Sequence, residues 1–218
     1  MAPVRAKIIT LETAVEAIHT YNRGEYRGRP NIELDRSATD MFREGLGRTL
    51  ERIRDQVGFI GRDYGGFAGF PAASSLAPTI AEAIFACRDD YASAAAMARP
   101  LHEELPPADT VETLCKPFIQ PFKRKRNWLV WGPKFWHFLR SDVFPIEDSR
   151  VDAFFHLNWR PDPVIRYLEM VRCFRTFALA NEAWLPRLRE ADGELTCDIK
   201  LWDKVFYSLG DHKHTSTC

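Results

Sequence analysis

Lys134 and Asp148 are the two residues whose types and spacing most directly suggest chemistry. Lys134 follows a Gly132-Pro133 break among aromatic residues, so we expect it at the start of a helix and partly desolvated. Burial and nearby positive charge both lower the pKa of a lysine, which makes a neutral amine available as a nucleophile. Asp148 follows fourteen residues later, after a turn at Pro145. A carboxylate there can deprotonate an attacking amine or water, or stabilise a sugar cation as it forms.

Basic residues around this pair predict contacts with phosphate. Four of them are consecutive: Lys123, Arg124, Lys125 and Arg126. A helical hairpin that turns at Gly132 directs free amides and the positive end of its second helix at one spot, which is a seat for a phosphate group. Arg150, two residues after Asp148, is a further candidate for a DNA contact. The alternative for the basic run is a solvated helix face.

Three aromatic residues are candidates for the wall of a base pocket. Phe67 and Phe70 lie in a glycine-rich segment, which has neither a preceding strand nor the GK[ST] signature of a nucleotide-binding loop. We interpret the segment as a mobile wall whose phenylalanines stack on a base. Trp131 is the third candidate. The alternative is that all three rings belong to the hydrophobic core.

Helical patterns cover most of the chain. We expect helices at residues 11–19, 37–53, 77–88, 91–98, 109–115, 127–139, 149–155, 163–180 and 196–209. Expected N-caps are Thr10, Ser37, Asp109, either Asp148 or Ser149, and Asp162. Residues 58–75 contain five glycines and predict a long loop. No alternating run is long enough for a sheet, so the prediction is an all-α fold with one domain, 1–218. The alternative within this domain is a division into two lobes, about 1–120 and 121–218.

Composition narrows the function classes. Thirty basic residues balance thirty acidic ones, so no global field attracts nucleic acid, and a local patch must do so. Five widely spaced cysteines argue against a disulfide framework, a zinc site and an iron–sulfur cluster, and indicate a reducing, cytoplasmic location. His212 and His214 lie in an expected frayed tail. We therefore expect no metal or other cofactor, and the absence of a long apolar stretch predicts no membrane span.

The residues around Lys134 and Asp148 resemble the helix-hairpin-helix DNA glycosylases, the superfamily of 8-oxoguanine DNA glycosylase and endonuclease III. Their hairpin, roughly L-P-G-V-G-x-K-x-A, precedes a P-V-D-x-H-V element. Gly132 matches the second hairpin glycine, Lys134 the lysine that forms a Schiff base, and Asp148 the catalytic aspartate. Pro145 and Val151 match the flanking proline and valine. The resemblance implies a helical bundle that flips a damaged base into a pocket between two lobes, and hence excision of an oxidised purine from DNA with lyase activity.

Departures from that pattern support other hypotheses. Val130 replaces the first hairpin glycine, Glu147 is inserted before Asp148, Arg150 stands in place of histidine, and the spacing from lysine to aspartate is shorter. A second hypothesis is therefore a glycosylase-fold binding module without base excision, whose partner is DNA, a modified nucleobase or another protein of its operon. The chain also resembles shortened glycosylase-like accessory proteins of bacterial antiphage operons. A third hypothesis is a helical scaffold in which Lys134 is only structural.

Overall fold

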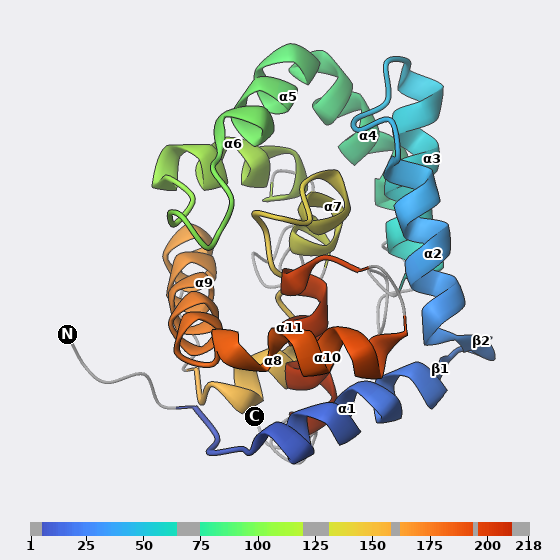
Figure 1. Ribbon diagram of the computed structural model, residues 1–218. Coiled ribbons are helices and arrows are strands. Elements are labelled where there is room, and N and C mark those ends of the chain that lie inside the picture. Colours follow the sequence, from blue (N-terminus) through green and yellow to red (C-terminus); the bar gives the residue numbers. More distant parts are fainter. Residues whose placement is uncertain (1–5, 65–74, 120–130, 158–161, 194–195, 211–218) are drawn as a thin grey trace, which may run out of the picture.

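The computed structural model describes residues 6–64, 75–119, 131–157, 162–193 and 196–210, and these are mostly helical (Figure 1). The helices are α1 (Leu11–Arg23), α2 (Asn31–Phe42), α3 (Leu50–Arg62), α4 (Ala77–Ala86), α5 (Arg88–Met97), α6 (Ala108–Ile119), α7 (Gly132–Leu139), α8 (Ser149–Phe154), α9 (Pro163–Ala180), the 3-10 helix η3 (Glu182–Trp184), α10 (Leu185–Asp192) and α11 (Asp198–Leu209). The sheet of the described residues is one antiparallel pair, β1 (Glu25–Tyr26) and β2 (Arg29–Pro30). The all-α prediction is confirmed.

Helices from the two ends of the chain lie together. In Figure 1, α1 crosses the lower edge of the molecule and packs on α10 and α11, which carry the end of the described chain. α11 also packs on α8. α9 packs on α6 and contacts α11 through the rings of Phe174 and Phe206. α7 lies in the middle of the upper group, in contact with α2, α3 and α6. The short helix α7 is therefore enclosed on several sides, and this placement buries its side chains.

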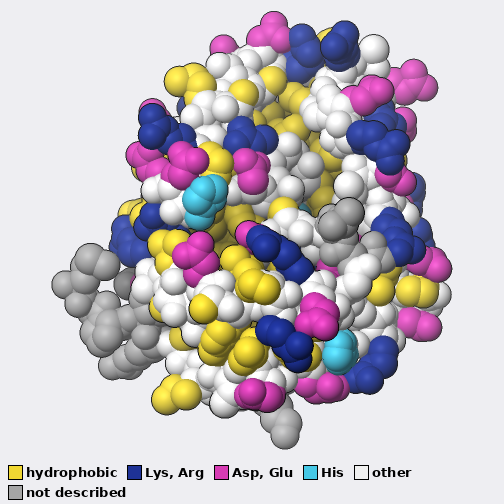
Figure 2. Space-filling model, viewed as in Figure 1, with side chains coloured by type: hydrophobic (Ala, Val, Ile, Leu, Met, Phe, Trp, Pro, Cys, Tyr) yellow, Lys and Arg dark blue, Asp and Glu magenta, His cyan; other side chains and the backbone are white. Residues whose placement is uncertain are grey.

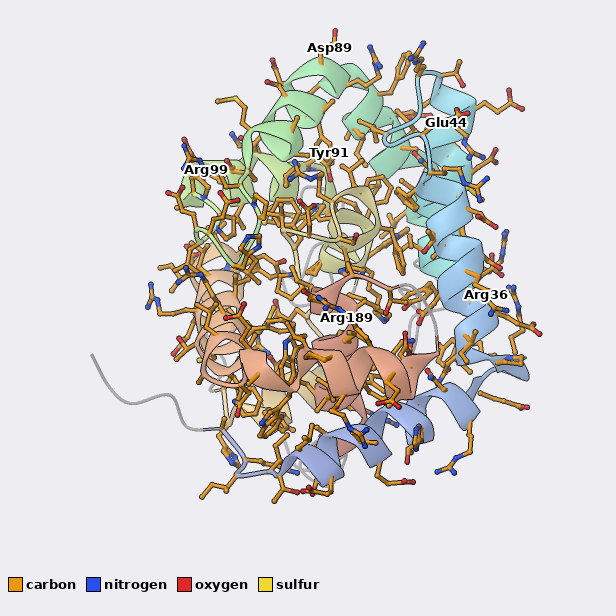
Figure 3. All side chains as sticks on the ribbon, viewed as in Figure 1. Arg36, Glu44, Asp89, Tyr91, Arg99 and Arg189 are labelled. Atoms are coloured by element: carbon orange, nitrogen blue, oxygen red, sulfur yellow. The ribbon has the colours of Figure 1, made fainter. Side chains whose placement is uncertain are left out.

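Aromatic side chains fill the space around α7. The Phe135 ring packs edge-on against that of Phe42, with 5.0 Å between the ring centres, and this pair joins α7 to α2. The Trp136 and Tyr167 rings pack in the same way, with 5.3 Å between their centres, and join α7 to α9. Tyr91, labelled in Figure 3, is fully buried, and its ring centre lies 6.4 Å from that of Phe135. Edge-to-face pairs of this kind contribute beyond the area they bury. They fix the orientation of α7 and hence of the residues it carries.

Several helix boundaries follow local capping signals. The Thr10 hydroxyl accepts from the Thr13 amide at 3.3 Å, and the Asp162 carboxylate from the Ile165 amide at 3.0 Å. With Pro163 in its first turn, α9 begins and ends where the sequence predicts. These caps are confirmed because each satisfies an amide that the first helical turn leaves without a partner.

Asp109 does not cap α6 as predicted. α6 begins one residue earlier, at Ala108, and the Asp109 carboxylate accepts from the neighbouring Thr110 amide at 2.8 Å. This local hydrogen bond from the Thr110 amide to the Asp109 side chain replaces the expected capping box.

The predicted helix from residue 37 to residue 53 is wrong. α2 begins at Asn31, and Ser37 lies inside it, where its hydroxyl donates to the Glu33 carbonyl at 2.8 Å instead of capping. The chain then breaks near Gly45, whose φ of +75° suits glycine, before Thr49 caps α3. A serine whose hydroxyl donates to the carbonyl of residue i−4 can lie inside a helix. The sequence around Ser37 does not distinguish such a serine from an N-cap.

The expected loop at 58–75 begins too early. Gly58 and Gly61 belong to α3, whose Val57, Phe59 and Ile60 are buried in the core. Each helical glycine costs about 1 kcal/mol relative to alanine, less than burial of the apolar side chains around it contributes. η3 and α10 were also not predicted.

Gly210 ends α11 where the sequence predicts, for a reason of packing. Its φ is −73°, so it is not in the left-handed conformation of a typical helix-ending glycine. A Cβ added here would lie 2.1 Å from the Arg150 carbonyl oxygen. The absence of a side chain lets the end of α11 approach the start of α8 closely.

Charged side chains of both signs lie on the described surface, and the described cysteines are free. Figure 2 shows basic and acidic side chains interspersed over one face of the molecule. Arg36 and Arg99, labelled in Figure 3, project outward. Cys87, Cys115, Cys173 and Cys197 are free thiols, and within the described ranges no cluster of three metal-binding side chains occurs. No helix in the described part of the chain has the length and apolarity needed to cross a membrane.

Candidate active site

Lys134 and Asp148 lie together. The Lys134 Nζ is 3.8 Å from Asp148 Oδ2 and donates to the Tyr64 carbonyl oxygen at 3.4 Å. Lys134 stands in the first turn of α7, which starts at Gly132-Pro133, and the residue is only 8% exposed. Proline at the first turn has no amide to leave unpaired, which explains why the helix begins there. The structure thus places the predicted nucleophile and its partner carboxylate within ion-pair distance.

The two carboxylate oxygens of Asp148 make different contacts. It is the N-cap of α8, and its Oδ1 accepts from the Arg150 amide at 3.0 Å. Its Oδ2 faces Lys134. Of the two predicted caps, Asp148 and Ser149, the structure has Asp148, and the cap geometry leaves its second oxygen available for the lysine. A carboxylate held in this way needs little reorganisation to act on a neighbouring amine.

The segment that carries Asp148 is fixed to α7 and α9. His137, one turn after Lys134, is 1% exposed and its Nδ1 lies 2.8 Å from the Phe144 carbonyl oxygen. A carbonyl only accepts, so Nδ1 carries the proton. The Tyr167 hydroxyl donates to the Pro145 carbonyl oxygen at 2.9 Å. Two buried side chains therefore hold the backbone that leads to Asp148.

Glu147, the residue inserted relative to the glycosylase pattern, adds a third anchor. Its Oε1 accepts from Arg166 Nε at 2.7 Å, and Arg166 also pairs with Asp152. Burial and the charge of Asp152 raise the pKa of Glu147 to about 8, while burial raises that of Asp152 to about 6. Glu147 is 2% exposed, so it points into the protein, while its neighbour Asp148 faces Lys134.

Burial controls the charge of α7's ionisable groups. Desolvation lowers the pKa of Lys134, against the opposing attraction of Asp148 and Asp203. Desolvation likewise lowers the pKa of His137 to about 3, so its ring is neutral at neutral pH. The lowered pKa gives Lys134 more neutral amine at a given pH than an exposed lysine has, which is what nucleophilic attack requires.

A second buried cluster lies beside this pair, centred on Lys200 of α11. The Lys200 Nζ is 2.9 Å from Asp203 Oδ2, 3.2 Å from Asp35 Oδ1 and 2.8 Å from the Tyr64 hydroxyl. The negative charges of Asp203 and Asp35 raise the pKa of Lys200 well above its ordinary value despite its burial. Lys200 is therefore a fixed cation.

The remaining predicted site residues are placed as follows. Trp131 is fully buried in the core and its indole nitrogen donates to the Val57 carbonyl oxygen at 3.2 Å. Gly132 is buried at the start of α7. The Arg150 guanidinium lies 4.2 Å from the centre of the Tyr207 ring. The basic run 123–126 and the residues Phe67 and Phe70 lie outside the described residues.

Sequence reasoning missed the groups that surround the pair. Tyr64, Asp35 and Lys200 are far apart in the chain, and only the packing of α2, α3 and α11 brings them together. One signal was available: Lys200 and Asp203 are charged residues three apart on the apolar stretch of α11, where both are buried. Charged residues on a buried helix face are rarely left unpaired.

Two cavities lie away from the pair. One, of about 550 Å³, is bounded by α9, η3, α10 and the start of α11, and Arg189, labelled in Figure 3, pairs with Asp198 beside it. The other, of about 400 Å³, lies between α1 and the end of α11. Neither Lys134 nor Asp148 lines them.

Comparison of the chain with protein-family models, curated proteins and solved structures found no match.

Proposed function

We propose that this protein is a DNA glycosylase-like enzyme in which Lys134 is the nucleophile and Asp148 its acid–base partner. One observation carries the proposal: a buried lysine with a lowered pKa lies 3.8 Å from a carboxylate, in the chain order of the glycosylase hairpin and aspartate. A desolvated amine beside a carboxylate suits attack on the anomeric carbon of a sugar.

The proposed reaction uses both groups. The Lys134 amine forms a bond to C1′ of a flipped nucleotide as the bond from C1′ to the base breaks and its electron pair leaves with the base. Asp148 stabilises the positive charge on the sugar, accepts the proton that the amine loses and passes it to the departing base. Opening of the sugar ring then gives a Schiff base, which permits strand nicking. An oxidised purine is the substrate class that the resemblance to 8-oxoguanine DNA glycosylase implies.

Borohydride trapping tests this proposal. The purified protein is incubated with DNA that carries 8-oxoguanine or an abasic site, and borohydride reduces the Schiff base to a stable adduct. We expect an adduct with the wild type that Lys134→Gln abolishes. Lys116→Gln, the same substitution at an exposed lysine of α6, is the matched control and should leave the adduct unchanged. No adduct with either DNA, or an adduct that persists in Lys134→Gln, would reject Lys134 as the nucleophile.

One observation favours a second candidate function. The Lys134 side chain is only 11% exposed and donates to a backbone carbonyl, so the amine is engaged by the protein itself. This agrees with a glycosylase-fold binding module, acting as an accessory protein in bacterial antiphage defence. It predicts DNA or nucleobase binding without an adduct. A steep loss of DNA affinity with salt would identify nucleic acid as the partner.

A further inference from the structure

Tyr64 touches both buried lysines. Its backbone oxygen accepts from Lys134 Nζ at 3.4 Å and its hydroxyl accepts from Lys200 Nζ at 2.8 Å. The two ammonium groups lie 5.8 Å and 5.6 Å from the centre of the Tyr64 ring, within the range of a cation–π contact. Tyr64 follows α3 by two residues, so it connects the end of that helix to α7 and α11.

The hydroxyl end of Tyr64 is firmly held. It donates to Asp35 Oδ1 at 2.6 Å while it accepts from Lys200, so both of its hydrogen bonds involve charged groups. Hydrogen bonds to charged groups are about twice as strong as neutral ones. Tyr21 reinforces the cluster, since its hydroxyl also donates to Asp35 Oδ1, at 3.2 Å. The far end of Tyr64 is thus anchored by α1, α2 and α11 together.

We propose that Tyr64, anchored by Lys200 and Asp35, is a positioning residue that holds the Lys134 amine against Asp148. The effect of this role on catalysis rests on the proposed function, but the role itself concerns the amine alone. The backbone of Tyr64 sets the position of the acceptor that Lys134 uses, and the ring shields the amine from one side.

Lys200 has a second effect, through charge. It pairs with Asp203 at 2.9 Å, and among the described residues Asp148 is the carboxylate left within ion-pair distance of Lys134. The charged or titratable groups that face Lys134 are Asp148, Asp203, Lys200 and Tyr64. Burial lowers the pKa of Lys134 and the charge of Lys200 lowers it further, whereas both carboxylates oppose the shift. Lys200 therefore favours the neutral amine.

Trace acetylation tests the inference without DNA. The protein is treated with limiting acetic anhydride over a range of pH, and mass spectrometry measures the acetylated fraction of Lys134 relative to exposed Lys116. In Lys200→Met we expect the titration midpoint of Lys134 to rise by about one pH unit, because a cation is lost and Asp203 is released. In Tyr64→Phe the plateau acetylation of Lys134 should rise severalfold, and the rate of borohydride trapping should fall about tenfold.

The controls separate position from general stability. Lys204→Met removes another buried lysine of α11, which pairs with Asp192 and lies farther from Asp35 (3.9 Å) than Lys200 does (3.2 Å). It should change the Lys134 midpoint less than Lys200→Met does, and the plateau less than Tyr64→Phe does. Should Lys200→Met fail to fold, Tyr64→Phe still decides, since it keeps the ring and backbone. An unchanged plateau in Tyr64→Phe would overturn the inference, as would an unchanged midpoint in folded Lys200→Met. A missing DNA adduct in the wild type would reject the proposed function but leave the acetylation result valid.

Discussion

Lys134 and Lys200 are both nearly inaccessible to solvent, at 8% and 4% exposure, but their surroundings differ. Lys134 has one carboxylate at 3.8 Å and a carbonyl at 3.4 Å. Lys200 has carboxylates at 2.9 Å and 3.2 Å and a tyrosine hydroxyl at 2.8 Å. The pKa of Lys134 is lowered by burial, while opposite charges raise that of Lys200.

The comparison shows that burial alone does not set the charge of an amine. Desolvation penalises the ammonium form at both sites, and the number and distance of acceptors decide whether that penalty is offset. The better-paired lysine serves as a fixed cation, and the less well-paired one is suited to act as a nucleophile. The two roles occur at neighbouring sites linked by Tyr64.

The largest expected effect is on stability. Lys200→Met should lower the free energy of unfolding by about 3–5 kcal/mol, because it removes the cation that lies nearest to the buried carboxylates of Asp35 and Asp203. Lys134→Met should change it by about 1 kcal/mol, since methionine keeps the packing and the substitution removes one ion pair at 3.8 Å and one long hydrogen bond at 3.4 Å. Urea denaturation followed by circular dichroism measures both. Equal losses in the two variants would contradict the comparison.

The two lysines should also have opposite effects on the pH dependence of stability. Between the lowered pKa of Lys134 and its ordinary value of 10.5, the unfolded chain binds more protons than the folded one, so stability rises with pH in that window. The contribution of Lys200 is complete below 10.5 and is lost as the pH rises above it towards the raised pKa.

The difference in unfolding free energy between the wild type and Lys134→Met isolates the first effect. It should increase from neutral pH up to 10.5 in favour of the wild type. A flat difference would mean that Lys134 has an ordinary pKa in the folded protein.

Substitution of Asp148 should have a smaller effect on stability, and two variants separate its role as the cap of α8 from its contact with Lys134. Asp148→Ala should cost about 1 kcal/mol through loss of the α8 cap, whereas Asp148→Asn keeps a capping oxygen and should retain most of that stability. Both variants should lower the pKa of Lys134 further, because the charge of Asp148 opposes the shift. Thermal unfolding and trace acetylation give the two readouts. Equal stability losses in the two variants would argue against the cap as the source of the loss.

The smallest expected effect on stability concerns a buried carboxylate, Glu147. Burial raises the pKa of Glu147 from 4.5 to about 8, so its contribution to stability is complete below 4.5 and is lost as the pH rises through about 8. Glu147→Gln should cost less than about 1 kcal/mol at neutral pH, since glutamine can still accept from Arg166. The difference in unfolding free energy between the wild type and Glu147→Gln, measured by urea denaturation, should therefore shift against the wild type as the pH rises from 4.5 to about 8, because the other titrating groups, Asp152 among them, are present in both proteins. A difference that stays constant over this range would exclude a raised pKa of Glu147.

Local signals predicted much of the helical framework. Asp162 with Pro163 gives α9 its start, Asp148 caps α8, and Gly132-Pro133 places Lys134 in a first turn. These signals work because a cap or a proline acts on neighbouring residues in the chain. Ser37 and the helical glycines of α3 misled the prediction because burial against other helices decided those segments.

By itself the sequence determined an all-α protein with a lysine at a helix start and an aspartate at the next cap, since both depend on contacts a few residues long. Only the tertiary structure decided that the lysine and aspartate face each other, that Glu147 pairs with Arg166, and that Lys200 reaches Tyr64 across 136 residues of chain. The physical reason is that the charge of a buried group depends on every acceptor that packing brings near it. Sequence neighbours reveal few of those acceptors.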